Sequence, residues 1–402
     1  NQTILSTAFP TIMKAFDVNT STVQWLTTGF MMVNGIMIPV SAWLSTRFNS
    51  KWLYISAMTT FFAGTIVCYI APNFATLLIG RLIQALGVGV TMPLLQTIML
   101  SIFPPAKRGT AMGLAGIVIG LAPAIGPTLS GWVIDNWTWR DLFGMIIPLM
   151  FLVILASFWL VRSVLDTKKT GIDLLSIVMS TIGFGSLLYG FSSVGEDGWG
   201  STIVISTLIV SVVFIALFIW RQLTMKTPFL EFRVYSSVPF TVSAILSSVT
   251  MMAMVGVEMV IPLYLQIVKG MSAFHSGLTL LAGALMMGIM SPITGRAVDR
   301  FGAKRLSILG MSLLTLGSIP FIFITKSTST LYIVVFYAIR MFGISMTMMP
   351  ATTVGMNSLP INLLSHGTAV NNTQRQDAAS VGTAVLISIL TNVTKSNKPA
   401  HS

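Results

Sequence analysis

The chain has 402 residues, of which 54% are hydrophobic and only 8% are charged, with a formal net charge of +12. Soluble domains carry about a quarter charged residues, so this composition excludes an ordinary soluble protein and predicts a polytopic membrane protein. The basic residues lie in short clusters between apolar runs, a pattern typical of cytoplasmic loops beside anionic lipid and not of a nucleic-acid-binding surface. The single cysteine, Cys68, excludes an intrachain disulfide and a multi-cysteine metal site.

Thirteen apolar runs follow one another along the chain, separated by polar breaks. A transmembrane helix needs about 20 predominantly apolar residues. The runs predict an all-α membrane protein with helices at residues 1–13, 23–46, 52–71, 74–100, 110–132, 141–162, 172–194, 200–220, 238–266, 274–296, 305–325, 330–355 and 367–392. Because the first run is too short to cross, we expect it to be part of a truncated helix.

Basic residues divide unevenly between the loops at the two ends of these helices. One set of loops holds fourteen, namely Arg47, Lys51, Lys107, Arg108, Arg162, Lys168, Lys169, Arg221, Lys226, Arg233, Arg296, Arg300, Lys304 and Arg305. The other set holds six, namely Lys14, Arg140, Lys269, Lys326, Lys395 and Lys398. Cytoplasmic loops carry the excess of Lys and Arg, so we expect the first set in the cytoplasm. The C-terminal tail then lies outside, which predicts that a fourteenth helix is missing.

Four short motifs recur in the same order in the two parts of the chain, at nearly the same offset. The matches are RFNSKWL with RFGAKRL, AFPTIM with VIPLYL, GVGVTMP with GISMTMMP, and RGTAMG with HGTAVN. The repeat predicts an N-terminal six-helix half at residues 1–165, two inserted linker helices at 166–236, and a C-terminal half at 237–402. Two such halves place a binding site near the bilayer midplane, at their interface.

Taken together, these motifs resemble the major facilitator superfamily, specifically its fourteen-helix drug:proton antiporter branch of multidrug and lincomycin-type exporters. GRAVDRFGAKR, from Gly295, is similar to the cytoplasmic loop motif of that superfamily, and APAIGPTLSGW, from Ala122, is similar to the span 5 motif of antiporters. RLIQALGVG, VQWLTTGF, WTWRDLF and HGTAVNNTQRQ fit the branch elsewhere, so the resemblance covers essentially the whole chain. Three positions depart from it, because Thr46 and Asn1 stand where the family usually has Asp, and Asn49 stands where it has Gly.

The resemblance implies that two motifs carry the gating residues. In the loop motif, glycine permits a tight turn, and the carboxylate of Asp299 can pair with the end of a neighbouring helix or with an Arg. In span 5, prolines interrupt the hydrogen-bond ladder and glycines allow close approach, which favours a flexing helix over ordinary packing. The expected gating residues are Gly295, Asp299, Arg300, Gly302, Arg305, Pro123, Gly126 and Pro127. Because the first-half loop has Thr46, we expect an asymmetric latch.

Five charged residues lie clearly inside the predicted spans, away from their ends, namely Arg81, Glu258, Arg340, Arg375 and Asp377. Such charges are costly in a membrane and usually face a cavity or a transport pathway. Burial in an apolar helix disfavours the charged form of Glu258, so a proton or a cationic substrate can compete for it. The alternative is a structural ion pair with an Arg. We expect proton coupling at Glu258, with Asp377 and Arg81 as further candidates.

Aromatic and polar side chains within the spans are candidates for substrate binding. Flexible, apolar and polarizable walls suit a cavity that accepts many ligands, and amide side chains can bond either a ligand or a neighbouring helix. The candidates are Phe9, Trp25, Phe30, Asn34, Gln96, Tyr264, Asn371 and Gln374. No nucleotide-binding loop or metal-ligand spacing occurs, so we expect no cofactor and no metal, with the proton as coupling ion.

These features and the resemblance predict a proton-coupled multidrug efflux antiporter rather than an enzyme. It would reside as a monomer in the bilayer of a bacterial cytoplasmic membrane and export amphipathic drugs, some of them cationic, by alternating access. A dedicated proton-coupled transporter of one metabolite is the alternative on the same fold, because a fold does not fix a substrate. A receptor that binds without transporting anything is a third possibility.

Overall fold

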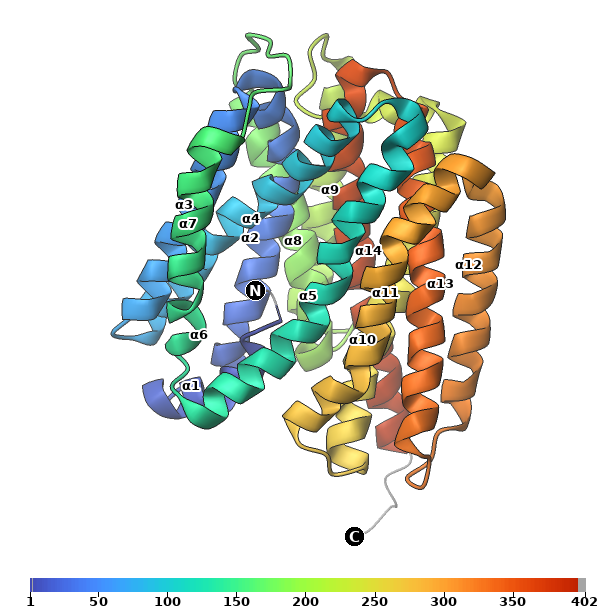
Figure 1. Cartoon of the computed structure of the whole chain (residues 1–402). Coiled ribbons are helices and arrows are strands. Elements are labelled where there is room, and N and C mark those ends of the chain that lie inside the picture. Colours follow the sequence, from blue (N-terminus) through green and yellow to red (C-terminus); the bar gives the residue numbers. More distant parts are fainter. Residues whose placement is uncertain (2, 397–402) are drawn as a thin grey trace.

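The computed structural model describes residue 1 and residues 3–396, and its long helices run side by side along a common direction (Figure 1). No β-strand occurs in this part of the chain. The helices are α1 (Phe9–Phe16), α2 (Thr20–Arg47), α3 (Ser50–Ile70), α4 (Phe74–Ile102), α5 (Arg108–Asn136), α6 (Asp141–Gly144), α7 (Ile146–Leu160), α8 (Leu174–Asp197), α9 (Thr202–Thr224), α10 (Val238–Leu263), α11 (Ala273–Phe301), α12 (Ala303–Ser318), α13 (Thr330–Asn357) and α14 (Leu364–Ser396).

Eleven described helical segments are long and apolar enough to cross a membrane. They correspond to the eleven predicted spans between residues 23 and 355. The first predicted span forms the 3-10 turn η1 (Ser6–Ala8) and the short helix α1, which ends at Asp17 with a left-handed φ of 51°. The last predicted span forms α14, a helix of 33 residues whose NNTQRQD stretch makes it more polar than the others.

Three predicted spans are less regular than expected, and a proline lies at each irregularity. Residues 141–162 were predicted as one helix, but they form α6 and α7, because Pro148 has no N–H to donate to the carbonyl of Gly144. After Pro262, α10 continues as the π-helical turn η4 (Tyr264–Val268). The predicted span 305–325 ends as the 3-10 turn η5 (Ile319–Phe323), which contains Pro320.

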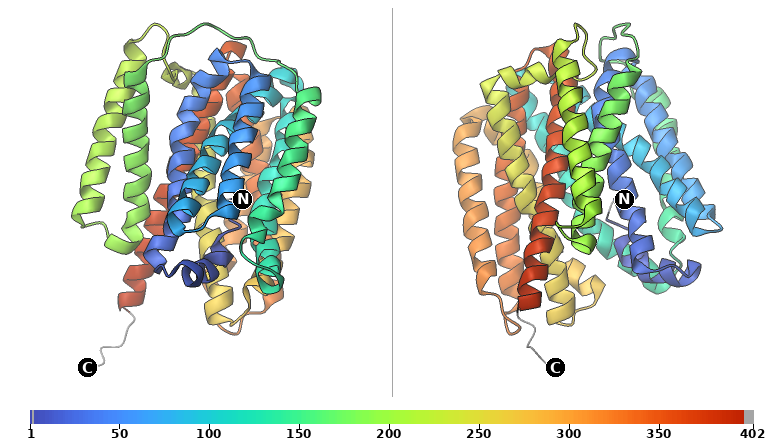
Figure 2. Two further views of the ribbon diagram at one scale, coloured as in Figure 1. Left: turned by 90° about the vertical axis from the view of Figure 1, so that its left-hand side faces the viewer. Right: turned by 180° about the vertical axis from the view of Figure 1, so that it is seen from behind.

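The two helices of the predicted insertion, α8 and α9, pack against each other and stand at one edge of the bundle (Figure 2). Along its length α8 also contacts α2 and α14. At one end, Arg221 of α9 donates two hydrogen bonds to Asp173, at 2.9 and 3.0 Å, which fixes the start of α8. These bonds hold the pKa of the Asp173 carboxyl below its ordinary value.

Glycines set close helix contacts within both predicted halves, in the α3–α4 pair and in the α12–α13 pair. In the α3–α4 pair, a Cβ atom on Gly64 would lie 2.6 Å from the backbone nitrogen of Gln84 and 2.7 Å from the carbonyl oxygen of Gly80. In the α12–α13 pair, Gly310 and Gly343 approach each other in the same way, with a Cβ on Gly343 only 2.6 Å from the Gly310 carbonyl oxygen. Small residues of this kind let membrane helices pack backbone to backbone.

Adding one methyl group at the α3–α4 contact tests this packing. Gly64→Ala forces a Cβ atom onto two backbone atoms that cannot move independently, so we expect the protein to lose about 1–3 kcal/mol of stability. Thermal unfolding of the purified protein in detergent measures the change. Gly171→Ala is the matched control, because no atom lies within 4 Å of its added Cβ. Equal melting temperatures for the two variants would contradict the close contact.

Candidate functional site

The loops that hold the larger set of basic residues all lie at one end of the bundle, which we call the basic end (top of Figure 1). These loops connect α2 to α3, α4 to α5, α7 to α8, α9 to α10 and α11 to α12, and the α13–α14 connection, which holds no Lys or Arg, lies at the same end. We call the other end, where α1 and α6 lie, the opposite end. Lys398, which was counted with the opposite set, lies outside the described residues.

At the basic end, the carboxylate of Asp299 from α11 caps the N-terminus of α5. Its Oδ1 accepts a hydrogen bond from the Gly109 N–H at 2.9 Å, and its Oδ2 accepts from the N–H and the Oγ1 of Thr110 at 2.9 and 2.8 Å. The N–H groups of a first helical turn lack partners and carry partial positive charge, so a carboxylate there is stabilising by about 0.3–1 kcal/mol at an exposed site. The cap joins residues from the two predicted halves.

Close approach of the α5 and α11 backbones makes this cap geometrically feasible. A Cβ atom on Gly113 would lie 2.5 Å from the carbonyl oxygen of Ser291, and a Cβ on Gly295 would overlap the carbonyl of Gly109. After α11, Gly302 adopts a φ of 82° and turns the chain directly into α12. A positive φ of this size is readily adopted by glycine and rarely by other residues.

Other contacts at the basic end reinforce the junction, but not every predicted gating residue takes part. Arg108 donates to Asn357 of α13 at 3.1 Å, and Asn357 donates to the carbonyl of Pro105 at 3.2 Å. Arg300 and Arg305 are exposed and, in the described chain, make no hydrogen bond or ion pair. The guanidinium of Arg300 lies 5.3 Å from the centroid of the adjacent Phe301 ring.

The first-half counterpart of the loop motif makes different contacts. The hydroxyl of Thr46 donates to the carbonyl of Trp43 in its own helix at 2.8 Å. Its backbone carbonyl accepts from the Lys168 N–H at 2.9 Å, in the segment that leads to α8. The side chain of Thr46 therefore caps no helix of the other predicted half, whereas that of Asp299 does.

A cavity of about 360 Å³ lies between α5, α10, α11, α13 and the segment before α1. Glu258 of α10 lines it, together with Pro123 and Pro127 of α5 and Tyr337 of α13. Most of the remaining lining is apolar. Gly126, the third predicted gating residue of α5, faces the N-terminal segment, since a Cβ there would lie 2.6 Å from Thr3 Oγ1. The structure thus brings Glu258 and the two prolines of α5 to one cavity.

The charged residue that acts on Glu258 across the helix interface is Arg340 of α13. The two do not form a direct ion pair, and among the described residues the Glu258 carboxylate accepts no hydrogen bond. Arg340 instead donates to the carbonyl of Ala253 at 2.7 Å and to the hydroxyl of Ser318, which ties α13 to α10 and α12. Glu258 is therefore a carboxylate facing a mostly apolar cavity without a fixed partner.

Arg81, a predicted proton-coupling residue, is fully buried inside the predicted first half. It donates to the carbonyl of Leu26 at 3.2 Å and to Gln84 at 3.0 Å, and Gln84 in turn donates to Thr65 at 2.8 Å. Its guanidinium lies 4.2 Å from the ring centroid of Phe30, a predicted substrate-binding residue. These contacts join α2, α3 and α4, so Arg81 and Phe30 are placed in a helix-joining network, apart from the Glu258 cavity.

A polar chain crosses from α4 to α14 between the predicted halves. Asn372 donates to Gln96 at 2.6 Å, and Arg375 donates to Asn372 at 2.7 Å. Gln96, a predicted substrate-binding residue, thus bonds a neighbouring helix. Of the other predicted amides, Asn371 is buried beside this chain, while Asn34 of α2 is partly exposed and faces Gly89 of α4.

The remaining polar candidates of α14 lie against the segment that enters α10. The hydroxyl of Tyr235 donates to Gln374 at 2.5 Å. Burial, with a smaller contribution from the Asp377 carboxylate, raises the pKa of the Tyr235 phenol to about 12, so the phenol keeps its proton. Asp377 therefore lies near Tyr235, and the described contacts do not connect it to Glu258.

The three aromatic side chains Phe9, Trp25 and Tyr264, predicted as walls of a substrate cavity, do not line the Glu258 cavity. Trp25 stacks on Tyr189 of α8, with ring centroids 5.7 Å apart. Tyr264 lies in the π-helical turn and donates to the carbonyl of Thr325 at 2.5 Å. Phe9 packs in the apolar cluster at the opposite end. Hydropathy identifies the spans but not which face of a helix meets which neighbour.

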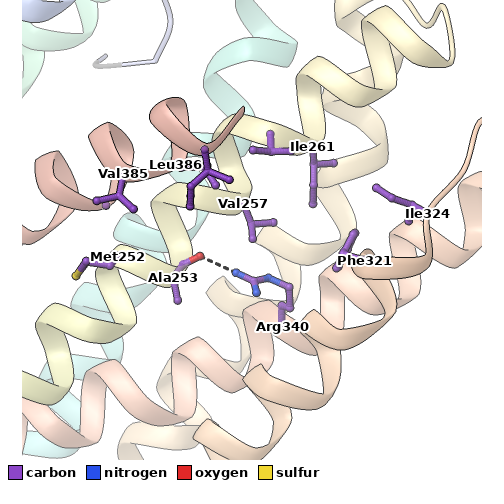
Figure 3. Close-up of a pocket in the computed structure, with 13 residues that line it drawn as sticks. Met252, Ala253, Val257, Ile261, Phe321, Ile324, Arg340, Val385 and Leu386 are labelled. Carbon is purple, nitrogen blue, oxygen red and sulfur yellow. Dashed lines mark hydrogen bonds between the residues drawn. The ribbon is translucent and has the colours of Figure 1, made fainter. Parts of the chain in front are cut away.

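A second, more apolar pocket of about 490 Å³ lies between α10, η5, α13 and α14 (Figure 3). Its walls include Val257, Phe321 and Leu386, and Arg340 reaches into it while donating to Ala253. Sequence reasoning assigned none of these wall residues to a site. It also missed Tyr337 and Asn372. The only feature of the sequence that could have indicated them is that each is a polar residue in a span that carries a charged residue.

The bundle of long apolar helices defines a multi-pass membrane protein, and a carboxylate in a cavity between such helices usually marks a substrate or ion pathway. The family model described as "Major Facilitator Superfamily" matches residues 1–383, and the chain belongs to this superfamily. The predicted family and the predicted all-α fold are thereby confirmed, and the chain is a transporter rather than an enzyme.

Two relatives and one solved structure illustrate the likeness. The chain is 50% identical over 402 residues to "Uncharacterized MFS-type transporter YcnB" of Bacillus subtilis, covering 100% of this chain and 84% of that protein. It is 41% identical over 390 residues to "Lincomycin resistance protein LmrB" of Listeria innocua, covering 97% and 83%. The human organic anion transporter MFSD10 shares the fold, with a TM-score of 0.66 at 14% identity over 95% of this chain and 83% of that one.

Neutralising Asp299 tests whether its cap holds α5 and α11 together at the basic end. Asp299→Asn removes the anion that three donors of α5 share, so we expect the closed state to lose about 1 kcal/mol of stability. At the basic end, α5 and α11 should then separate more often. Spin labels at Lys107→Cys and Lys304→Cys, in a Cys68→Ala background, report the distance distribution. Asp166→Asn, an exposed change in the α7–α8 loop, is the control. Identical distributions for the two variants would show that the cap does not hold the gate.

Proposed function

We propose that this protein is a proton-coupled multidrug efflux antiporter of a bacterial cytoplasmic membrane. The observation that carries the proposal is Glu258, a carboxylate without an ion-pair partner in a mostly apolar cavity between helices. A buried ionisable group of this kind can gain and lose a proton, and it usually marks a substrate or ion pathway. The name of the Listeria relative, a lincomycin resistance protein, supports drug export as the process.

In the proposed cycle, substrate enters from the basic end or the inner leaflet and leaves at the opposite end. Protonation of Glu258 from outside displaces the substrate, and return of that proton to the cytoplasm resets the carrier. Moving one charge through the membrane potential supplies about 2.3 kcal/mol per 100 mV. The cap made by Asp299 closes the basic end during the outward-facing part of the cycle, and Pro123 and Pro127 give α5 the flexibility to change shape beside Glu258.

Apolar lining and one titratable group suit amphipathic substrates of several shapes, because non-directional contacts tolerate variation. In this proposal the monomer works in the bilayer with the proton as its coupling ion, and it needs no cofactor and binds no nucleic acid. The alternative is a dedicated proton-coupled transporter of one metabolite on the same fold. A panel of chemically unrelated substrates separates the two, since only the multidrug exporter moves several of them.

Transport by the purified protein is the first test. Reconstituted in proteoliposomes with an imposed proton gradient, it should move rhodamine 6G and at least one neutral amphipathic dye against their gradients. Dissipating the proton gradient with a protonophore should stop both movements, and empty liposomes give the background. Movement of a single compound would favour the dedicated transporter, and movement of none would refute the exporter.

Replacing the carboxylate of Glu258 tests its place in the cycle. Glu258→Gln keeps the side-chain volume but cannot exchange a proton, so we expect proton-driven dye movement to fall at least tenfold while the melting temperature stays close to that of the wild type. The control is Asp197→Asn, an exposed neutralisation at the last residue of α8. Undiminished transport by Glu258→Gln across a range of external pH would show that another group carries the proton.

A further inference from the structure

Four nitrogen atoms that can only donate hydrogen bonds are buried without partners among the described residues of α4 and α14, where these helices meet each other and α2. They are Nε and Nη1 of Arg375, Nε2 of Gln96 and Nε2 of Gln376. The chain from Arg375 through Asn372 to Gln96 places three of them in one network, and Gln376 lies one helical turn beyond Asn372, facing Gly35 of α2. An unsatisfied buried donor costs about 1–3 kcal/mol, and native structures keep few of them.

Arg375 is the charged member of this cluster, and 92% of its surface is buried (8% exposed). Of its guanidinium nitrogens, Nη2 has a bond in the described structure, to Asn372, and no carboxylate forms an ion pair with it. Asp377 lies two positions further along α14, where a helix directs side chains to a different face. The cluster thus combines a fork of planar donors, which suits a carboxylate or sulfonate, with the amide donor of Gln96, linked to it through Asn372, and that of Gln376, the next residue along α14.

We propose that Arg375, Gln96 and Gln376 form a subsite for the anionic, acceptor-rich end of a transported amphipathic molecule. The subsite lies where α14 meets α2 and α4. Separation of the two predicted halves at the basic end would break the Asn372–Gln96 bond and expose the donors to a substrate arriving from that side. This inference rests on the proposed function, and it deepens it by adding carboxylate- or sulfonate-bearing amphipaths to the neutral and cationic substrates expected from the Glu258 cavity.

Two xanthene dyes of similar shape and opposite charge make the inference testable. Equilibrium binding of fluorescein, an anion, and rhodamine 6G, a cation, is measured by fluorescence polarisation with the full chain in nanodiscs. We expect Arg375→Gln to raise the Kd of fluorescein at least tenfold and that of rhodamine 6G less than twofold, while Arg375→Lys restores part of the fluorescein affinity. Arg162→Gln, an exposed change of the same kind, should alter neither.

A second variant keeps the test decisive if Arg375→Gln does not fold. Gln96→Glu places a carboxylate in the hydrogen-bonded network that Arg375 reaches through Asn372, where it competes with an anionic ligand for the buried donors, so it should weaken fluorescein binding at least tenfold. Gln24→Glu, exposed on α2, is its matched control. Unchanged fluorescein affinity in these variants, or an equal loss of affinity for both dyes, would overturn the subsite.

Binding and transport outcomes separate this inference from the proposed function. If rhodamine 6G is moved by the proton gradient while fluorescein fails to bind the wild type, the exporter stands and the anionic subsite is wrong. If fluorescein binds in an Arg375-dependent manner but no dye moves, the subsite stands and the exporter is wrong.

Discussion

The backbones of α5 and α11 touch where side chains would hold them apart, and much of the remaining arrangement depends on that contact. Gly109 and Gly295 meet at the basic end, which brings the carboxylate of Asp299 onto the first turn of α5. Further along the pair, Pro123 and Pro127 leave the helix ladder incomplete and border the cavity of Glu258. One helix pair thus carries both the closure at one end and a wall of the ionisable site.

The two polar sites lie at different depths. Counting from the basic end, Glu258 stands 20 residues into α10 and Arg375 stands 11 residues into α14, which at 1.5 Å per residue corresponds to roughly 30 and 16 Å. Glu258 borders a cavity, whereas the donors around Arg375 are enclosed between helices. In this conformation, therefore, Glu258 faces a cavity, and the donors around Arg375 do not.

Sequence reasoning located the spans well because an apolar run of sufficient length has few alternatives in a membrane. It also singled out Asp299 and Glu258, since a charge at a tight turn or inside a span is conspicuous. It did not place Trp25, which stacks on Tyr189, or Tyr264, which lies in a π-helical turn. All-round hydrophobicity hides which face of a helix meets its neighbour, and proline distorts the helical register that such an assignment would need.

Asymmetry between the two loop motifs has a mechanical consequence. Asp299 bonds across the predicted halves, whereas Thr46 bonds within its own helix and to the segment before α8. A closed state held by one anionic cap loses less free energy on opening than one held by two, by about 0.3–1 kcal/mol. Because a ligand shifts a two-state equilibrium only by its differential affinity, a weaker closed state lowers the affinity difference that substrate binding has to provide. The missing carboxylate at position 46 therefore favours opening of the basic end with weakly bound substrates.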